Sequence, residues 1–484
     1  MTSTEVKSNI RGGPDPELTD IANYVLSYRA SGRKGRNGRN GRKVLNIARL
    51  RFTDTLACGL DALDDPDCTK LLGPVMPGTV VPNGARVPGT AYVLDPVKAA
   101  FDTGTMIRWL DYNDTFTAAQ GSHPSDNLGG ILAAADALSG AGQPITMRDV
   151  LEALIEAYEI QGCIAIENDF NAMGIDHTTL SRVAVAAVVT RMMGGTKQEI
   201  VNAISNAWID ASLRVYRQAP NAGWRKSWAA GNAVAEGVRL ARMAMAGEMG
   251  YPTVLTAPKW GFYARYRDGQ PFKFQRPYGD YVIQNSMFKF VAAGMHGQSA
   301  VECAFRLHPL VKDRLNDIAR IDINSQRALM GIMDKTGPLH NPADRDHSVQ
   351  YIVAVGLIHG KLNAADFSDA FAADPRIDAL RAKVIVREDP RYTREFVDPK
   401  KRSSANAIQI TFKDGSSTPK VEVEFPMGHP KRLKDAGPVL RKKFESSLAR
   451  RFGAKRVKQI LALCDDGRRF EATPVRDFMT LLAA

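Results

Sequence analysis

The sequence MRDVLEALIEAYEIQG at residues 147–162 has the apolar pattern of a helix with one buried face. Leu151 and Ile155 recur at a spacing of about four residues, close to the helical period. Thr146 precedes the run and Asp149 follows three positions later, a spacing that resembles a capping box. We therefore expect a helix to begin here.

The helical pattern extends outward on both sides and covers residues 95–250. Gly194 and Gly195 end one predicted helix, and Thr196 with Glu199 forms a capping box for the next. These two helices are expected to form an αα-hairpin. Alanine and other small residues occupy several faces of the predicted helices, which favours packing inside a bundle.

A strand period replaces the helical one later in the chain. Residues 408–412 and 421–425 each alternate apolar and polar side chains, and an Asp-Gly pair lies between them, which predicts a β-hairpin. Residues 321–323 and 384–386 are candidate partner strands. The pattern is helical again from Val439 onward.

Together these patterns predict a mainly α protein with a large all-helical domain. A smaller α/β lid domain is inserted before a C-terminal helical segment. We predict the first part of the helical domain at residues 1–283, the lid domain at 284–430 and the helical return at 431–484. A length of 484 residues agrees with two or three domains.

The composition argues against several classes of protein. Hydrophobic residues make up 44% of the chain and charged residues 24%, as in ordinary soluble proteins. No apolar run approaches the roughly 18 residues of a membrane span, and the N-terminus shows no signal peptide, so we expect a cytoplasmic protein without membrane contact. The five cysteines lack the spacing of a zinc, iron–sulfur or disulfide framework, and no metal is expected.

The net charge of +12 is concentrated in one segment. Residues 33–43, RKGRNGRNGRK, carry six positive charges, and we predict a basic, Gly-rich loop over residues 31–43. A solvated loop explains this composition, because no aromatic-interleaved motif or RNA-binding signature accompanies it. Binding of nucleic acid through the loop is the alternative from another class of function, and we rank it lower.

Residues 109–130, WLDYNDTFTAAQGSHPSDNLGG, place acids, amides, hydroxyls and an imidazole between two apolar helical stretches. Such groups are costly to bury unless they are paired or used in chemistry. Pro124 biases its neighbour away from helical dihedral angles, and Ser125 or Asp126 is well placed to cap the helix that follows. The first candidate site residues are Asp111, Thr115 and His123.

Two further segments place imidazoles and cations at predicted helix starts. His177 lies at or just after a helix N-cap, where a structural role and a functional role are about equally expected. A loop broken by Gly and Pro precedes a helix predicted to begin at Trp228, and it carries Arg214, Arg217, Arg225 and Lys226. Four cations on one loop either form a solvated face or bind a multiply charged acid, and we favour the acid.

The second half of the chain adds two segments. Lys289 lies between two phenylalanines and either extends its ammonium group to solvent or meets a carboxylate, and His296 precedes a helix. Residues 344–347, Asp-Arg-Asp-His, precede another helix, and N-capping by Asp346 is the strongest explanation of that segment. Arg345 within it is a candidate for substrate binding.

These segments offer histidines, lysines and arginines, and neither GxGxxG nor GxxxxGK[ST] occurs in the chain. This combination suits a small polycarboxylate that is handled without a nucleotide. The reaction class it favours is removal of a proton next to a carboxylate, with loss of water or carbon dioxide. A neighbouring cation would stabilise the charge that develops on the carboxylate.

Several long motifs are similar to those of the MmgE/PrpD family, and the resemblance runs from about residue 16 to the C-terminus. They are WLDYNDT, HPSDNLGG, GIDHTTL, NAGWRKSWAAGNA, GEMGYPTVLTAPKWGFY, FQRPYGDYV and GPLHNPADRDHSVQYIV. The resemblance implies a cofactor-independent homodimer with an active site between a helical domain and an α/β lid.

The activity that the resemblance implies is dehydration of the tricarboxylate 2-methylcitrate to 2-methyl-cis-aconitate, in the methylcitrate cycle of propionate catabolism. By correspondence with the cis-aconitate decarboxylases of the same family, the pocket residues are Asp111, Thr115, His123, His177, Lys226 and Lys289, with His296 as a further candidate. We add Arg217, Arg225 and Arg345 as substrate-binding candidates. A cis-aconitate decarboxylase, or another polycarboxylate lyase or epimerase of the family, is the alternative.

The chain departs from the family pattern at three places. Residues 31–43 replace part of an early helix, and Gly121-Ser122 stands where the family's dehydratases have Trp-Gly. After Lys289 the segment VAAGMH is one residue shorter than its counterpart. An impaired site is therefore a third alternative.

The mechanism that we predict uses two histidines. One of His123 and His177 removes the proton, and the other, or a water that it orients, protonates the departing hydroxyl. Lys226 and Lys289, with arginines such as Arg225, hold the substrate carboxylates. Asp111 is expected to fix an imidazole, and Thr115 to hydrogen-bond the substrate.

Overall fold

A computed structural model of the protein describes residues 11–30 and 38–484. Most of these residues are helical, which confirms the mainly α fold class. The helices before residue 290 pack around one hydrophobic core, and we call them, with the C-terminal helices that join this core, the helical body. The first part of the body contains α1 (Pro16–Ser27), α2 (Gly38–Ala62), α3 (Pro66–Thr69), α4 (Pro96–Trp109), α5 (Leu128–Gly140), α6 (Met147–Ala165), α7 (Thr178–Met192), α8 (Lys197–Ile209), α9 (Arg225–Met245), α10 (Phe262–Tyr266) and α11 (Tyr281–Asn285).

The helix starts and stops in this bundle follow the predicted signals. The Thr146 N–H donates to the Asp149 carboxylate over 2.8 Å at the start of α6, and Thr196 donates to Glu199 over 2.6 Å at the start of α8. Gly194 ends α7 with a φ of 83°, a left-handed conformation that favours glycine. Both capping boxes and the α7–α8 hairpin are therefore confirmed.

One short strand pair interrupts the helical body, so the prediction of an all-helical domain was wrong in this detail. β1 (Ala85–Arg86) pairs antiparallel with β2 (Val93–Leu94). Pro88-Gly89 lies in the connection, where Gly89 has a φ of 73° and the Thr90 N–H donates to the Val87 carbonyl. A Pro-Gly turn of this kind brings the flanking residues side by side.

A second hydrophobic core lies within residues 291–423, which we call the α/β region. Its sheet has the strand order β4-β3-β5-β6, with β3 parallel to β4 and the other neighbours antiparallel. The strands are β3 (Ile318–Ser325), β4 (Val384–Glu388), β5 (Asn406–Phe412) and β6 (Val421–Val423), which confirms the predicted hairpin and both candidate partner strands.

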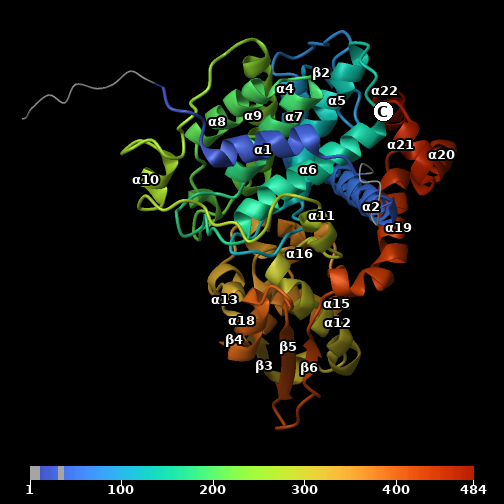
Figure 1. Cartoon of the computed structure of the whole chain (residues 1–484). Helices are drawn as coiled ribbons and strands as arrows, with labels where there is room; N and C mark the ends of the chain where they lie inside the picture. The colour runs from blue at the N-terminus through green and yellow to red at the C-terminus, as the bar shows by residue number, and fades with distance from the viewer. Residues whose placement is uncertain (1–10, 31–37) are drawn as a thin grey trace, which may run out of the picture.

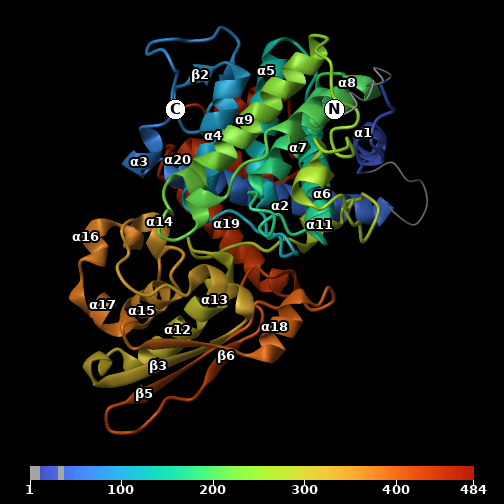
Figure 2. The same cartoon turned by 90° about the vertical axis from the view of Figure 1, so that its left-hand side faces the viewer.

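Helices complete the α/β region. They are α12 (Gln298–Val311), α13 (Arg327–Met333), α14 (Pro342–Arg345), α15 (Val349–His359), α16 (Asp369–Ala372), α17 (Pro375–Arg381) and α18 (Pro390–Val397). In Figures 1 and 2 this region lies below the helical body, and α12 lies close to the sheet.

The chain then returns to the helical body. The returning helices are α19 (Leu433–Ala449), α20 (Ala454–Asp465), α21 (Gly467–Ala472) and α22 (Val475–Leu482). Figure 1 shows α19 leading back beside α2, and Phe444 and Phe478 join the core of the body. Among the described residues, no helix combines the length and the apolar character that a membrane crossing requires.

Residues 31–37 of the predicted basic loop lie outside the described residues. For the residues that follow, the loop prediction was wrong, because α2 already begins at Gly38. Val44 and Leu45 bury one face of this helix, and Arg42 forms a 2.5 Å ion pair with Glu471 of α21. These contacts hold the Gly-rich residues in the first turns of α2.

Candidate active site

A cavity of about 260 Å³ lies where the helical body meets the α/β region. The body contributes polar lining residues that include Arg108, Asp111, Thr115, His123, His177 and Arg217. The α/β region contributes Met295, His296, Ala328, Ile332, His347 and Phe396. Imidazoles and cations from distant parts of the sequence therefore meet in one place.

A larger hollow of about 650 Å³ lies between α19 and α20. Its walls combine Phe452, Val457 and Leu461 with a few exposed charges, and they carry no histidine. Its carboxylates and its lysine are exposed to solvent and no imidazole accompanies them, so we place the candidate active site in the smaller cavity.

Asp111 is the centre of a buried ion network beside the cavity. It follows the end of α4 with a φ of 49°, a left-handed conformation that few residues other than glycine adopt. Its Oδ1 accepts from Arg108 Nη1 and Lys289 Nζ, each at 2.5 Å, and its Oδ2 lies 3.1 Å from His347 Nε2. Burial alone would raise the pKa of Asp111, but Arg108 and Lys289 hold this pKa well below its usual range.

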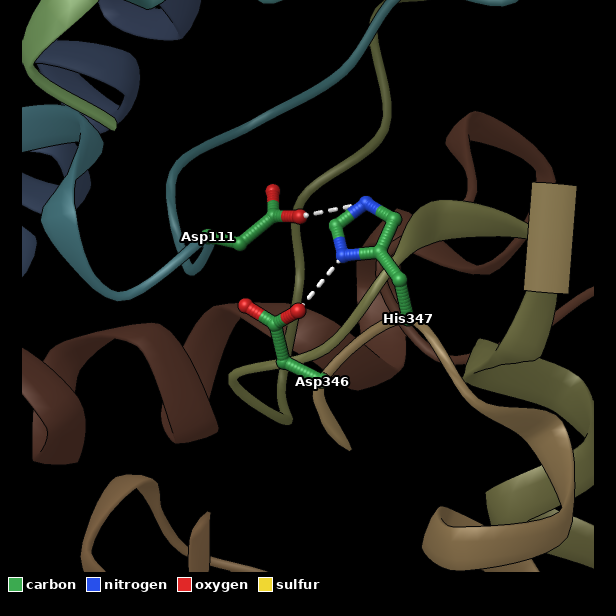
Figure 3. A group of neighbouring side chains, drawn as sticks. All are labelled: Asp111, Asp346 and His347. Atoms are coloured by element: carbon green, nitrogen blue, oxygen red, sulfur yellow. Dashed lines mark hydrogen bonds and ion pairs between the residues drawn. The ribbon is translucent and has the colours of Figure 1, made fainter. Parts of the chain in front are cut away.

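Lys226, Asp346 and His347 continue the network across the two regions. The Lys226 ammonium donates to both carboxylate oxygens of Asp346 at 2.6 Å, and the same carboxylate lies 2.6 Å from His347 Nδ1. Figure 3 shows the His347 ring between the carboxylates of Asp111 and Asp346. Asp111 and Lys226 belong to the body, whereas Asp346 and His347 belong to the α/β region, so these ion pairs connect the two regions.

Ligand atoms of Asp111, Asp346 and His347 lie within 4.8 Å of one another, close enough to hold a metal ion. The carboxylates already accept from Arg108, Lys289 and Lys226. Three cationic side chains balance two carboxylates, so a further cation here would be repelled. The cluster therefore does not fit a metal centre.

His123 has both ring nitrogens engaged. Its Nδ1 donates a hydrogen bond to the Asp114 carbonyl at 2.7 Å, and its Nε2 accepts a hydrogen bond from Arg108 Nη2 at 3.0 Å. Burial and the neighbouring Arg108 hold the pKa of His123 well below its ordinary value. His123 is therefore a neutral imidazole with a fixed tautomer.

The segment after His123 forms the short 3₁₀ helix η1 (Pro124–Asn127) before α5. Asn113 donates to Ser125 Oγ and to Asp126 Oδ1, both at 2.8 Å. The prediction that Ser125 or Asp126 caps the next helix was wrong, because Asn113 engages both side chains and Asn127 occupies the N-cap of α5.

His177 occupies the N-cap of α7, as predicted. Its Nε2 differs from the two ring nitrogens of His123 in its hydrogen bonding. This Nε2 is buried and has no hydrogen-bond partner among the described residues. Its Nδ1 lies 3.6 Å from Asp176 Oδ1, and the carboxylate favours the tautomer that keeps the proton on Nδ1. Burial lowers the pKa of His177 to about 3 despite Asp176, so Nε2 offers a free lone pair.

Arg214 and Arg217 lie on the loop that packs against the His177 segment. The Asp176 N–H donates to the Ser212 carbonyl at 2.8 Å, and the Arg214 N–H donates to the Gly174 carbonyl at 3.2 Å. Arg217 forms an ion pair with Asp176, whereas the Arg214 side chain lines the cavity with a buried Nε that has no partner in the described chain. Arg214 is therefore the cation most available to an anionic ligand.

The prediction that a loop extends to Trp228 was wrong, because α9 already begins at Arg225. Trp224, at the N-cap of α9, stacks on Trp109 with ring centroids 4.7 Å apart. Because this contact holds the N-cap in place, the helix begins before the predicted start at Trp228. Lys226 consequently lies in the first turn of α9 and points its ammonium at Asp346.

Two candidate arginines do not line the cavity. Arg225 is exposed and lies 4.2 Å from the ring centroid of Trp228. Arg345 donates to the Phe367 carbonyl and pairs with Asp369, both at 2.7 Å. Each guanidinium contacts a neighbour outside the cavity.

Asp346 does not cap a helix, which corrects the prediction for that segment. Ser348 is the N-cap of α15, and its hydroxyl accepts from the Tyr351 N–H at 3.3 Å. The carboxylate of Asp346 is thereby left free for Lys226 and His347.

Thr115 and His296 both line the cavity. The Thr115 hydroxyl donates to the Ser122 carbonyl at 3.1 Å, which leaves its oxygen lone pairs available. His296 Nδ1 lies 3.4 Å from Gln326 Nε2, and its ring lies 5.3 Å from that of Phe396. The shortened segment between Lys289 and His296 thus still brings one residue to Asp111 and the other to the cavity.

Sequence reasoning missed Arg108 and His347 as site residues. Arg108 lies three residues before Asp111 at the end of α4, a spacing at which oppositely charged side chains meet. His347 lies directly after Asp346 and before a serine that is itself a good N-cap. Both signals were present in the sequence.

Comparison with known proteins identifies the family. The model of the MmgE/PrpD N-terminal domain matches residues 19–275, and that of the MmgE/PrpD C-terminal domain matches residues 291–466. The chain belongs to the MmgE/PrpD family. It is 53% identical to a 2-methylcitrate dehydratase of Cupriavidus necator over 99% of this chain and 100% of the relative. It is 51% identical to a 2-methylcitrate dehydratase of Escherichia coli (strain K12) over 98% of each chain, and 48% identical to the mitochondrial 2-methylcitrate dehydratase of Yarrowia lipolytica over 95% of this chain and 89% of the relative.

Proposed function

We propose that this protein is a hydro-lyase that dehydrates 2-methylcitrate to 2-methyl-cis-aconitate in the methylcitrate cycle. Relatives that carry the name 2-methylcitrate dehydratase match the chain along nearly its full length. The structural observation that carries the proposal is the cavity lined by His177, whose Nε2 has no partner among the described residues, and by Arg214.

Arginines of the body bind the carboxylates of the substrate. Arg214 has no competing partner in the described chain, and Arg217 and Arg108 line the same cavity. Guanidinium groups form strong, charge-assisted hydrogen bonds with carboxylates. Lys226 and Lys289 act indirectly, because they keep Asp346 and Asp111 ionised beside His347.

His177 is the general base of the proposed reaction. Its Nε2 accepts the proton from the carbon next to a substrate carboxylate, and an arginine stabilises the negative charge that develops on that carboxylate. The C–O bond to the hydroxyl then breaks and the C=C bond forms. The proton returns from His177 to the departing hydroxide, which leaves as water.

His123 and Thr115 position the reacting groups. His123 accepts from Arg108 and thereby orients this guanidinium at the cavity wall, with the two imidazole centroids 5.4 Å apart. Thr115 offers its oxygen lone pairs to the substrate hydroxyl. His296 and His347 close the cavity from the α/β region.

The proposal extends to the organisation of the enzyme. Residues 284–430 act as a lid domain that closes on the helical domain, and the enzyme works as a cytoplasmic homodimer without a cofactor. Light scattering on the protein as it elutes from a size-exclusion column tests the dimer, since a dimer has twice the mass of the 52.9 kDa chain.

A product assay tests the reaction. The purified protein is incubated separately with 2-methylcitrate and with cis-aconitate, and the products are identified by mass spectrometry. We expect loss of water from 2-methylcitrate and no release of carbon dioxide from cis-aconitate. Decarboxylation of cis-aconitate without dehydration of 2-methylcitrate would instead support the family's other lyase activity.

A further inference from the structure

The part of the cavity wall contributed by the α/β region is largely apolar. Ala328 and Ile332 lie four residues apart on α13 and therefore project from the same helix face. Phe396 of α18 and Met295 extend this surface, which we call the apolar wall. The opposite wall, from the helical body, carries arginines, carboxylates and imidazoles.

The apolar wall is held in place by hydrogen bonds. The Gln326 side chain caps α13 by accepting from the Leu329 N–H at 2.5 Å, and the Arg327 N–H donates to Thr393 of α18 at 3.0 Å. The same Gln326 reaches His296. Helices α13 and α18 therefore have a fixed position relative to an imidazole of the cavity.

We propose that the apolar wall receives the methyl group of the substrate and selects 2-methylcitrate over citrate. This inference rests on the proposed function, because it names the part of the same site that distinguishes the two acids. Citrate has the same carboxylates and hydroxyl but lacks the methyl group. The polar wall can bind these shared groups of both acids, whereas an apolar surface gains only from burying the extra methyl.

The size of the selectivity follows from the chemistry of small apolar pockets. One methylene more or less in such a pocket changes kcat/KM by about 10- to 200-fold. We expect the native enzyme to favour 2-methylcitrate within this range. The quantity to measure is the ratio of kcat/KM for 2-methylcitrate to kcat/KM for citrate.

Substitutions that trim or enlarge the wall test the proposal in opposite directions. Ile332→Ala and Phe396→Ala remove surface that contacts the methyl group, so each lowers the ratio, mainly through the value for 2-methylcitrate. Ala328→Val fills the space of the methyl group and lowers the ratio further, while citrate is still turned over. Val397→Ala is the matched control, because Val397 neighbours Phe396 but is 71% exposed and does not line the cavity.

Several outcomes are informative. Ratios that fall in the wall variants and stay constant in the control support the proposal. A native ratio near one, or wall variants that lose both activities equally while circular dichroism shows a folded protein, overturns the apolar wall as the selecting element. If a wall variant unfolds, Phe396→Leu provides the same comparison with a smaller change. Absence of turnover of either acid by the native protein refutes the proposed function itself.

Discussion

The two walls of the cavity are built on different physical principles. The wall from the helical body consists of charged groups whose geometry is fixed by ion pairs, such as those that Asp111 forms with Arg108 and Lys289. The wall from the α/β region offers apolar side chains and two imidazoles. In the proposed function, the body therefore carries out proton transfer and carboxylate binding, and the α/β region sets the shape and closure of the cavity.

Within the body wall, His177 and His123 provide the sharpest test of this assignment. Replacement His177→Gln removes the ring nitrogen that has no partner in the described part of the chain, and it is expected to lower kcat by about 10²- to 10⁴-fold. His123→Gln removes a group whose nitrogens are already engaged, and a smaller loss is expected. Steady-state kinetics on 2-methylcitrate at saturating substrate measure both effects, and undiminished turnover by the His177 variant would contradict the proposed base.

The second prediction concerns the ion pairs that connect the two walls and their contribution to the stability of the fold. Lys226→Met leaves the buried Asp346 without its ammonium partner, and loss of one member of such a pair costs about 3–5 kcal/mol of stability. Urea unfolding of the Lys226→Met, Asp346→Asn and double variants measures this loss. The double variant should be more stable than the two single losses predict when added, because it leaves neither charge alone.

An exposed ion pair supplies the control for this experiment. Arg376 pairs with Asp374 on the surface of the α/β region with its side chain 55% exposed. Arg376→Ala should change stability by less than about 1 kcal/mol. Equal losses of unfolding free energy at the exposed and the buried pair would show that the ion pairs between the two walls stabilise the fold no more than a surface ion pair does.

A third prediction compares Arg214, on the loop before α9, with Arg225, the first residue of α9. Arg214→Met removes a cation that has no ion-pair partner among residues 11–30 and 38–484, and loss of charged hydrogen bonds of about 1.5–3 kcal/mol corresponds to a rise in KM of about 10- to 150-fold. Arg225→Met removes an exposed cation that stacks on Trp228 and should leave KM unchanged. A KM that responds to Arg225 but not to Arg214 would move the carboxylate site out of the cavity.

The sequence predicted more of the fold than of the side-chain partners in the site. The caps of α6, α7 and α8 depend on residues close together in the chain, as does the β5–β6 hairpin, so local rules are sufficient. The partners of Lys226 and Lys289 lie more than 100 residues away in sequence. Their spacing in the sequence reveals no contact and therefore did not predict these ion pairs.

Family resemblance partly overcame this limit. It named Asp111, His123 and His177, which the structure brings together at one cavity. It did not name Arg108, which the sequence analysis did not consider, or His347, whose segment was explained as an ordinary helix start. Arg225 and Arg345 were chosen for their charge and their place before a predicted helix, and neither property says which neighbour a guanidinium will meet.

The last prediction concerns pH and again separates cavity residues from surface residues. Burial lowers the pKa of His177 from 6.5 to about 3 in the folded protein, whereas the unfolded chain binds the proton near 6.5. Below pH 6.5 the unfolded state therefore holds more protons than the folded state, so this contribution to stability is complete above pH 6.5 and is lost as the pH falls toward 3.

Over this interval each such histidine gives a slope of about 1.4 kcal/mol per pH unit. The variant His177→Gln should accordingly show a shallower fall in unfolding free energy between pH 6 and pH 4 than the native protein, measured by urea titration at each pH. His340→Gln replaces an exposed histidine outside the cavity and should follow the native curve. A His177 variant that also follows the native curve would mean that the folded protein accepts a proton at His177 as readily as the unfolded chain. Nε2 would then be protonated in mildly acidic solution and activity would fall there, while the role of His177 as the base near neutral pH would stand.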